Sequence, residues 1–285
     1  MKTKNTHKYH TYSKPETRNY HDHDHDHDMP RKKKGLGQNF LRKQSVVDNM
    51  IAKVTITSET SVLEIGCGDG FLTKSILDQS KCKKLVCYEI DPDWVKYVSK
   101  KIKNSRLEIR LKNILESNFA QELSADKPWV ILANLPYQIT FPIIFLIQQN
   151  KDLFQEGVIM VQEEVAQKIV ANRGKGYSPT SLLLQYNFDW TLMEKIEPGA
   201  FSPPPKVYSR LLHFRPKFDQ QAIPHEEEFW RFLKCCFRSP RQTLRNNIKS
   251  TQYFTSSGWS DELLNMRAQQ LLFDDFLKIW DQINK

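Results

Sequence analysis

Four consecutive residues, Asn134, Leu135, Pro136 and Tyr137, combine groups suited to holding a flat molecule that forms hydrogen bonds. An amide oxygen and a peptide carbonyl accept hydrogen bonds from an amine, and proline stiffens the backbone that presents them. A tyrosine ring supplies a face on which a base can stack, which is worth about 1–3 kcal/mol. A simple turn explains the same residues, because Asn and Pro are common in turns. The surrounding sequence must therefore decide between a turn and a binding motif.

A second candidate site lies earlier in the chain, where a strand-like run enters "LEIGCGDG" with glycines at Gly66, Gly68 and Gly70. Glycine lets the backbone approach a ligand closely, and ligands of doubly wound sheets lie at the carboxyl ends of the strands. The next strand-like run ends in Glu89, whose carboxylate can accept both hydroxyls of a ribose. These features fit a nicotinamide dinucleotide and S-adenosylmethionine equally well, because both contain an adenosine ribose.

The tetrapeptide favours S-adenosylmethionine. A dehydrogenase needs a proton-transfer group near its hydride acceptor, and six of the eight histidines precede residue 30. Adenine carries an amino nitrogen that is a poor nucleophile because its lone pair is delocalised, and acceptors at Asn134 and Leu135 would hold it in line with a sulfonium methyl. No general base is required, since the proton leaves after the nitrogen is alkylated. We therefore interpret Asn134, Leu135, Pro136 and Tyr137 as catalytic residues for methyl transfer to an amine.

These motifs lie in a chain that alternates strand-like and helix-like segments. Strands are expected at 61–66, 83–90, 106–113, 128–134 and 156–162, with helices at 70–80, 91–103, 141–150 and 163–172. Near-continuous apolar strands in such an alternation predict a parallel sheet covered on both faces. Segments 190–198 and 206–214 are predicted to be antiparallel strands at one edge. The expected fold class is α/β, a Rossmann-like methyltransferase sheet, mostly parallel, with a small all-α C-terminal domain.

Three regions follow from changes in this pattern. Residues 1–34 contain "HDHDHDHD" and almost no aliphatic side chains, so we expect a disordered tail. Residues 35–217 form the expected α/β domain, and residues 218–285 contain only helix-like segments. The His–Asp alternation is typical of a solvated tail, and loose binding of a divalent metal is the alternative.

Composition narrows the class of protein further. The net charge of +9 suggests a polyanionic partner if the charge is clustered. No apolar stretch approaches the length of a membrane span, so we expect a cytoplasmic protein without membrane contact. The five cysteines form no C-x-x-C pair, so we expect a reducing compartment and no metal site. His213 lies in a strand-like stretch and is interpreted as structural.

Several motifs together resemble the small-subunit ribosomal RNA adenine dimethyltransferases (KsgA type), from about Gly35 to the C-terminus. "GLGQNFL" is similar to that family's N-terminal cofactor motif, "LEIGCGDGFLT" to its glycine loop, "EID" at 89–91 to its ribose-binding acid and "NLPY" to its catalytic motif. "FSPPPKVYS" at 201–209 resembles its C-terminal signature loop, and "RQTLRNN" at 241–247 its helical domain.

The resemblance implies a cofactor, a substrate and residue roles. S-adenosyl-L-methionine would contact residues from several motifs, namely Asn39, Leu41, Gly66, Glu89 and Asn134. Asn134 would also hold the target amine, and Tyr137 would stack the base. Two adjacent adenines of small-subunit rRNA, within a pre-ribosomal small subunit, would each receive two methyls. We expect the enzyme to act as a monomer.

Two departures from the family pattern affect this expectation. Asn113 stands where the family usually has an aspartate that accepts from the adenine amino group of the cofactor. An amide oxygen still accepts that bond, and a neutral bond is about half as strong as a charge-assisted one, so we predict weaker cofactor binding. "KGYSPTS" at 175–181 lacks an arginine that the family places near the RNA.

Basic residues near these motifs predict where RNA binds. The RNA-binding candidates come from the end of the tail, the proline-rich loop and the basic segment after residue 237: Lys33, Lys34, Phe201, Lys206, Arg238, Arg241 and Arg245. A solvated helix face is the alternative for each arginine. For Phe201 the alternative to a wall of the adenine pocket is a plain connection between edge strands.

The sequence is also compatible with two other functions. The related methyltransferases that modify large-subunit rRNA share the cofactor motifs, although "FSPPPKV" and the C-terminal helices argue against them. A non-catalytic RNA-binding factor that retains the pocket is the second alternative, and Asn113 is the residue that supports it.

Overall fold

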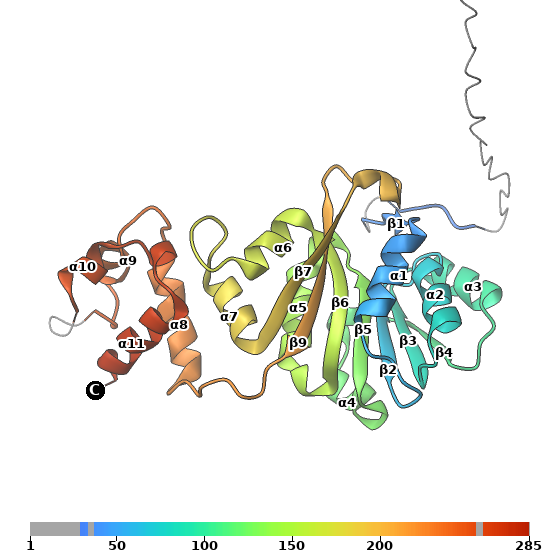
Figure 1. Ribbon diagram of the computed structural model, residues 1–285, viewed down its shortest axis with the longest axis horizontal. Helices are drawn as coiled ribbons and strands as arrows, with labels where there is room; N and C mark the ends of the chain where they lie inside the picture. The colour runs from blue at the N-terminus through green and yellow to red at the C-terminus, as the bar shows by residue number, and fades with distance from the viewer. Residues whose placement is uncertain (1–28, 34–36, 255–258, 285) are drawn as a thin grey trace, which may run out of the picture.

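The structure is a computed structural model that describes residues 29–33, 37–254 and 259–284 (Figure 1). The predicted disordered tail therefore lies outside the described residues up to residue 28, as does Lys34. Residues 29–33, which the composition assigns to that tail, contact the folded domain through Lys32 and Lys33.

The described strands form a seven-stranded sheet and a two-stranded sheet. The order of the larger one is β4-β3-β2-β5-β6-β9-β7, and β1 pairs with β8. The strands are β1 (Phe40–Leu41), β2 (Ser61–Ile65), β3 (Lys84–Glu89), β4 (Leu107–Leu111), β5 (Trp129–Asn134), β6 (Phe154–Gln162), β7 (Phe188–Ile196), β8 (Phe201–Ser202) and β9 (Ser209–Pro216).

Strands β2 to β6 are parallel, and β9 pairs antiparallel with both β6 and β7. This arrangement confirms the predicted, mostly parallel sheet with an antiparallel edge. The chain moves outward from β2 in both directions, through β3 to β4 and through β5 to β6. The carboxyl ends of β2 and β5 therefore flank the point where the strand order reverses, which is where ligands of such sheets bind.

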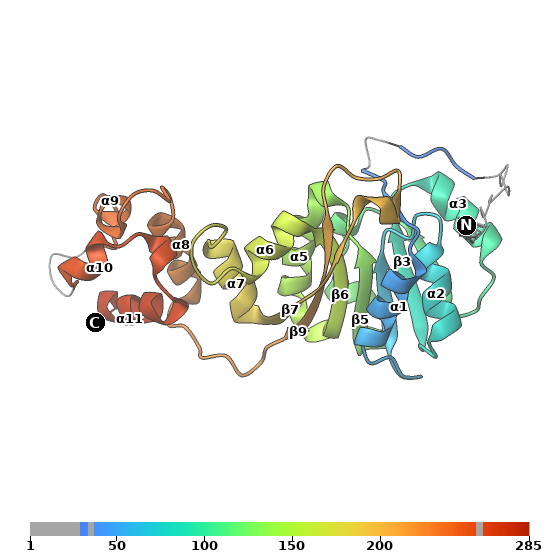
Figure 2. The same cartoon turned by 45° about the horizontal axis from the view of Figure 1, so that its top comes forward.

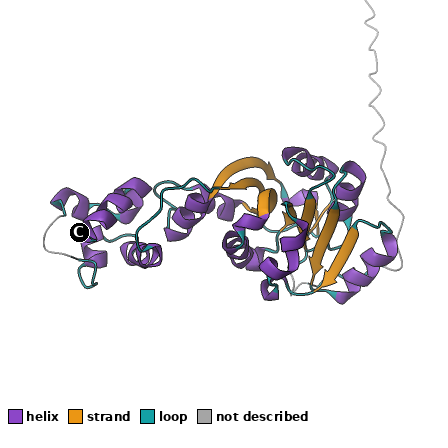
Figure 3. Ribbon diagram, turned by 90° about the horizontal axis from the view of Figure 1, so that it is seen from below, coloured by secondary structure: helices purple, strands orange, loops and turns teal. Residues whose placement is uncertain are grey.

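Helices cover both faces of the large sheet (Figure 3). One face packs on α1 (Gln44–Lys53), α2 (Phe71–Gln79) and α3 (Pro92–Lys101), and the other on α4 (Phe119–Leu123), α5 (Thr140–Gln149), α6 (Glu163–Val170) and α7 (Pro179–Asn187). Fully buried aliphatic residues such as Val62 and Leu63 alternate between the two cores, because successive side chains of a strand point to opposite faces.

The C-terminal part is all-helical and follows an extended segment after β9 (Figure 2). Its helices are α8 (Glu226–Cys236), α9 (Leu244–Ile248), α10 (Asp261–Asn265) and α11 (Phe273–Ile283). They enclose a third core rich in aromatic rings, and this core includes Tyr177 and Leu182 from the region of α7. The helical part therefore shares apolar contacts with the first domain beyond its covalent connection.

The described helices include none with the length and apolar character needed to cross a membrane.

Candidate functional site

A pocket opens at the carboxyl ends of β2, β3 and β5, and its empty space, including the part open to solvent, measures about 1040 Å³. Every cofactor-binding and catalytic residue named from the sequence lines it, namely Asn39, Leu41, Gly66, Glu89, Asn113, Asn134, Leu135, Pro136 and Tyr137. The structure thus gathers motifs that lie far apart in the sequence around one space.

The glycine loop shapes the floor of this pocket. Gly66, Gly68 and Gly70 have φ values of 77°, 52° and 83°, a region that side chains other than glycine seldom adopt. A Cβ on Gly68 would come within 2.5 Å of the Phe40 ring, whereas a Cβ on Gly66 would meet nothing within 4 Å. Gly66 therefore faces open space, and Gly68 allows β1 to lie against the loop.

Glu89 ends β3 with its side chain fixed toward the pocket. The residue is 7% exposed. Its carboxylate accepts from Gly68 N at 3.1 Å and from Asp91 N at 2.9 Å. Burial raises the pKa of Glu89, and the backbone donors oppose that rise. The side chain is thus a fixed acceptor, as a ribose-binding residue requires.

Asn134 has its amide oriented by the N-terminal motif. Its Nδ2 donates to the carbonyl oxygen of Asn39 at 3.0 Å, so Oδ1 is the atom left to accept from a ligand. Leu135 is anchored on the neighbouring strand, because its N–H donates to Met160 O at 3.1 Å. Both candidate acceptors of the tetrapeptide therefore sit on constrained backbone.

Tyr137 is fixed by a residue of β9. Its hydroxyl and Ser209 Oγ lie 2.5 Å apart, and burial raises the pKa of the phenol. Pro136 has φ −60° and accepts from Thr140 Oγ1 at 3.1 Å. The ring is therefore held by β9. Sequence reasoning missed this contact, since no motif marks Ser209 as a partner of Tyr137.

Asn113 caps the short helical turn Ile114–Glu116 that follows β4. Its Oδ1 accepts from Leu115 N at 3.1 Å, and its Nδ2 donates to Glu116 Oε1 at 3.0 Å. One lone pair of Oδ1 thus remains for a further donor. The predicted acceptor is present, and Glu116 is a neighbour that the sequence analysis did not consider.

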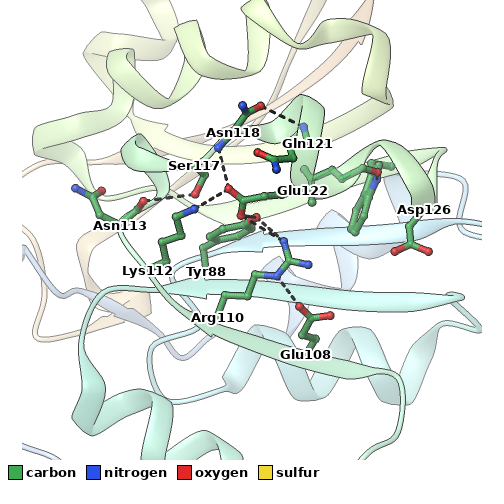
Figure 4. A network of polar contacts seen from close by, with 12 residues as sticks. Tyr88, Glu108, Arg110, Lys112, Asn113, Ser117, Asn118, Gln121, Glu122 and Asp126 are labelled. Carbon is green, nitrogen blue, oxygen red and sulfur yellow. Dashed lines mark hydrogen bonds and ion pairs between the residues drawn. The ribbon is translucent and has the colours of Figure 1, made fainter.

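A polar network holds the loop next to Asn113 (Figure 4). Glu122 accepts from Lys112 Nζ at 2.7 Å and from the Tyr88 hydroxyl at 2.8 Å. Arg110 donates to the same hydroxyl at 2.7 Å. These bonds join the ends of β3 and β4 to α4, so the loop that carries Asn113 is tied to the sheet.

The N-terminal motif closes one side of the pocket. β1 pairs antiparallel with β8, in the register Phe40 with Ser202 and Leu41 with Phe201. Behind it, Asp91 accepts from Lys33 Nζ at 2.7 Å and from Gln38 Nε2 at 3.1 Å. Because Asp91 N also donates to Glu89, Asp91 connects the N-terminal motif directly to Glu89.

The RNA-binding candidates fall into two groups. Lys206, Arg238 and Arg241 are exposed, and Arg238 also donates to Asn247 O at 3.3 Å. Three others have protein partners or are buried: Lys33 pairs with Asp91 and Asp93, Arg245 pairs with Asp261, and Phe201 is 4% exposed within the core. The side chain of Phe201, on β8, packs into the core that also contains α1 to α3, and its contact with RNA stays a prediction.

His213 and Glu156 form a buried pair, with 2.8 Å between His213 Nε2 and Glu156 Oε2. They lie on β9 and β6, outside the pocket lining. Asp91 and Gln38 belong to the quoted motifs, but the sequence analysis assigned neither of them a role in the site. Asp91 was recognisable as a helix N-cap, which it is.

A family model described as "Ribosomal RNA adenine dimethylase" matches residues 29–285. A "Ribosomal RNA small subunit methyltransferase A" from Mesomycoplasma hyopneumoniae (strain J) is 35% identical over 257 residues, covering 88% of this chain and 96% of the relative. One from Geobacter metallireducens is 34% identical over 258 residues, covering 86% and 93%.

Solved structures agree in fold. A dimethyladenosine transferase from Plasmodium falciparum superposes with a TM-score of 0.73 at 26% identity, covering 86% of this chain and 97% of that one. The 23S rRNA methyltransferase ErmE has a TM-score of 0.65 at 20% identity, covering 87% and 100%. The likeness to ErmE reflects the shared fold alone.

Proposed function

The chain belongs to the ribosomal RNA adenine dimethylase family, and we propose that it transfers methyl groups from S-adenosyl-L-methionine to the N6 amino groups of two adjacent adenines of small-subunit rRNA. The product is N6,N6-dimethyladenosine, formed in a pre-ribosomal small subunit. The enzyme acts in the cytoplasm as a monomer.

The observation that carries this proposal is the state of Asn134. Its amide lies at the carboxyl end of β5, with Nδ2 bonded to Asn39 O at 3.0 Å and Oδ1 left for the pocket that Glu89 also lines. A hydrogen-bond acceptor held beside a ribose-binding carboxylate is what a methyl transfer to an exocyclic amine needs.

The residues around the pocket fit S-adenosylmethionine. Glu89 is a buried carboxylate with fixed orientation. A Cβ added to Gly66 would project into open space, so the glycine leaves room for a ligand to approach the backbone closely. Asn113 Oδ1 keeps an acceptor site for an adenine amino group.

When bound, the cofactor supplies an electrophilic methyl on a sulfonium sulfur. The protein holds the acceptor amine: Asn134 Oδ1 and Leu135 O accept hydrogen bonds from its two N–H groups, and Tyr137 stacks the base. The lone pair of the nitrogen is thereby directed along the line of transfer. The proton leaves to water once the nitrogen is alkylated, so no side chain has to act as a general base. Rate enhancement then comes mainly from positioning.

The small subunit is preferred over the large one because of the relatives. Two proteins named small subunit methyltransferase A are 35% and 34% identical to this chain, whereas ErmE is 20% identical. The loop that follows β8 is the sequence feature that argues against the large-subunit family. The helices α8 to α11 do not discriminate, because the ErmE match covers 87% of this chain and so extends into them.

The decisive experiment is transfer of labelled methyl to small subunits with unmethylated adenines. We expect N6,N6-dimethyladenosine with the parent protein. The rate with Asn134→Ala should fall by roughly a hundredfold at least, since an oriented group of this kind contributes on the order of 10²-fold or more. Glu89→Ala should weaken cofactor binding instead. Transfer to large subunits only would contradict the substrate, and transfer to neither would favour a non-catalytic RNA-binding factor.

A further inference from the structure

An exposed aromatic residue precedes Ser209, the partner of Tyr137, and has no role in the mechanism above. Tyr208, in the loop between β8 and β9, is 48% exposed. Tyrosine normally buries much of its ring in packing, so we asked what this half-exposed ring could bind.

Two hydrogen bonds fix the backbone of this residue close to the catalytic motif. Tyr208 O accepts from Glu163 N at 2.9 Å, which fixes the loop at the carboxyl end of β6. The following residue, Ser209, lies 2.5 Å from the Tyr137 hydroxyl. Tyr208 is therefore one residue away from the side chain that holds the predicted stacking ring, beyond the carboxyl end of β6.

One lysine lies over the ring, and a second is two residues before it in the sequence. The Lys195 ammonium lies 4.3 Å from the ring centroid, and both Lys195 and Lys206 are exposed. An ammonium over an aromatic face holds the ring in place through a cation–π interaction. A flat face next to cations suits a single-stranded nucleic acid, whose bases stack while its phosphates pair with lysines.

We propose that Tyr208 stacks a nucleobase of the substrate strand that lies next to the target adenine. The inference rests on the proposed function, because the strand must enter the pocket beside Tyr137 for this contact to form. Tyr208 then sets the register of the strand, and it does so without touching the reacting atoms.

The chain provides a matched control. Phe218 is also exposed, at 65%, with the Lys151 ammonium 5.4 Å from its ring centroid. It follows the other end of the eight-residue strand β9. That strand is about 26 Å long at about 3.3 Å per residue, so it separates the two aromatic residues. The two aromatics thus share their local chemistry and differ in distance from the pocket.

The test compares Tyr208→Ala, Tyr208→Phe and Phe218→Ala in two assays. The first measures kcat and KM for methyl transfer to unmethylated small subunits. The second measures fluorescence of a short small-subunit RNA hairpin with 2-aminopurine beside the target adenine, because stacking on an aromatic ring quenches that probe. Calorimetric titration with S-adenosylmethionine shows that each variant retains its pocket.

We expect Tyr208→Ala to raise KM for the subunit about 5- to 150-fold, the range that corresponds to the loss of one stacked base. It should also abolish the quenching, leaving cofactor affinity and kcat close to those of the parent. Tyr208→Phe should retain both properties, and Phe218→Ala should change neither.

An unchanged KM and unchanged quenching in Tyr208→Ala would overturn the inference, as would an equal loss in Phe218→Ala. If the parent quenches the probe through Tyr208 but transfers no methyl, the stacking contact stands and the proposed function fails. If the parent transfers methyl and Tyr208→Ala has the same KM and the same quenching, the proposed function stands and the stacking contact fails.

Discussion

At the scale of single residues, Asn113 shows how a neutral side chain fits where the family usually carries an aspartate. Its Nδ2 donates to Glu116 at 3.0 Å, a bond that an aspartate could not make. An aspartate here would face a second carboxylate, and like charges at that distance repel each other. The charge on Glu116 therefore favours asparagine over aspartate at position 113 in this chain.

We predict that Asn113→Asp combined with Glu116→Gln binds S-adenosylmethionine about fivefold more tightly than the parent. A charged acceptor gains roughly 1 kcal/mol over a neutral one, and the amide introduced by Glu116→Gln would supply the donor that the pair otherwise loses. Asn113→Asp alone should gain less, and Glu116→Gln alone should change little. Calorimetric titration measures all three, and an unchanged affinity in the double variant would mean that residue 113 does not touch the cofactor.

Glu64 is a buried carboxyl whose protonation affects stability. It is 1% exposed, accepts from Thr73 Oγ1 at 2.7 Å and from Cys87 Sγ at 3.1 Å, and burial raises its pKa to about 7 from an ordinary 4.5. The folded state therefore holds the proton more tightly than the unfolded state. The stability that this provides is complete below about pH 4.5 and is lost as the pH rises to about 7.

For this reason Glu64→Gln, which keeps an acceptor but does not titrate, should gain stability relative to the parent as the pH rises from 5 to 8. The difference between parent and variant should grow by up to about 3 kcal/mol over that interval, at about 1.36 kcal/mol per pKa unit. Urea unfolding at both pH values measures it. A difference that stays constant with pH would show that Glu64 titrates normally.

At the scale of elements, the sequence indicated the strands and helices with strong periodicity, and the structure confirms their order. It did not indicate α7, although Ser178 as N-cap and Pro179 at the first helical position were usable signals. The pair β1–β8 offered no such signal, because each strand has two residues and its partner is remote in sequence. Local patterns carry no information about pairing over that distance.

For the site, the motifs named residues that line one pocket, but they did not reveal the contacts that orient these residues. Lys33 is the clearest case. As part of a basic run it suggested RNA binding, yet its ammonium pairs with Asp91 and Asp93. A composition argument counts charges and cannot reveal a buried carboxylate that follows a strand 58 residues later.

We therefore predict that Lys33→Ala weakens cofactor binding about three- to tenfold, roughly 1 kcal/mol, because Asp91 connects Lys33 and Gln38 to the Glu89 position. Lys33→Arg should restore most of the affinity. Lys96→Ala, which removes an exposed charge from the same helix as Asp93, serves as the control. Loss of RNA affinity with unchanged cofactor affinity in Lys33→Ala would instead support the original RNA-binding assignment.

At the scale of the whole molecule, the helical part and the α/β part meet through a shared core. Tyr177 and Leu182 lie in the same apolar cluster as Phe232 and Trp280. The exposed arginines Arg238 and Arg241 follow α8, so this contact places them at a defined position relative to the pocket. Residues 218–285 carry as many acidic as basic side chains, so the net charge of +9 comes from residues 1–217 and the positive charge of the helical part is local to these arginines.

Exchange of Lys206, Arg238 and Arg241 for glutamine should reduce the dependence of RNA affinity on salt. Each lost phosphate contact lowers the slope of log K against log salt by about 0.7 to 0.9, so three contacts lower it by about 2 to 3. A matched triple exchange of Lys53, Lys81 and Lys127, exposed at the opposite edge of the sheet, should leave the slope nearly unchanged. Equal effects of both triples would indicate a diffuse attraction.

The pairing of β1 with β8 also bears on how the protein is made. Chains emerge from the ribosome N-terminus first, and domains tend to fold in that order. Here the register joins Phe40 with Ser202, so the strand that is synthesised first has no partner until most of the chain has emerged. A nascent enzyme of this kind gains its complete cofactor site late in translation, after the ribosome has already read through every other motif of the pocket.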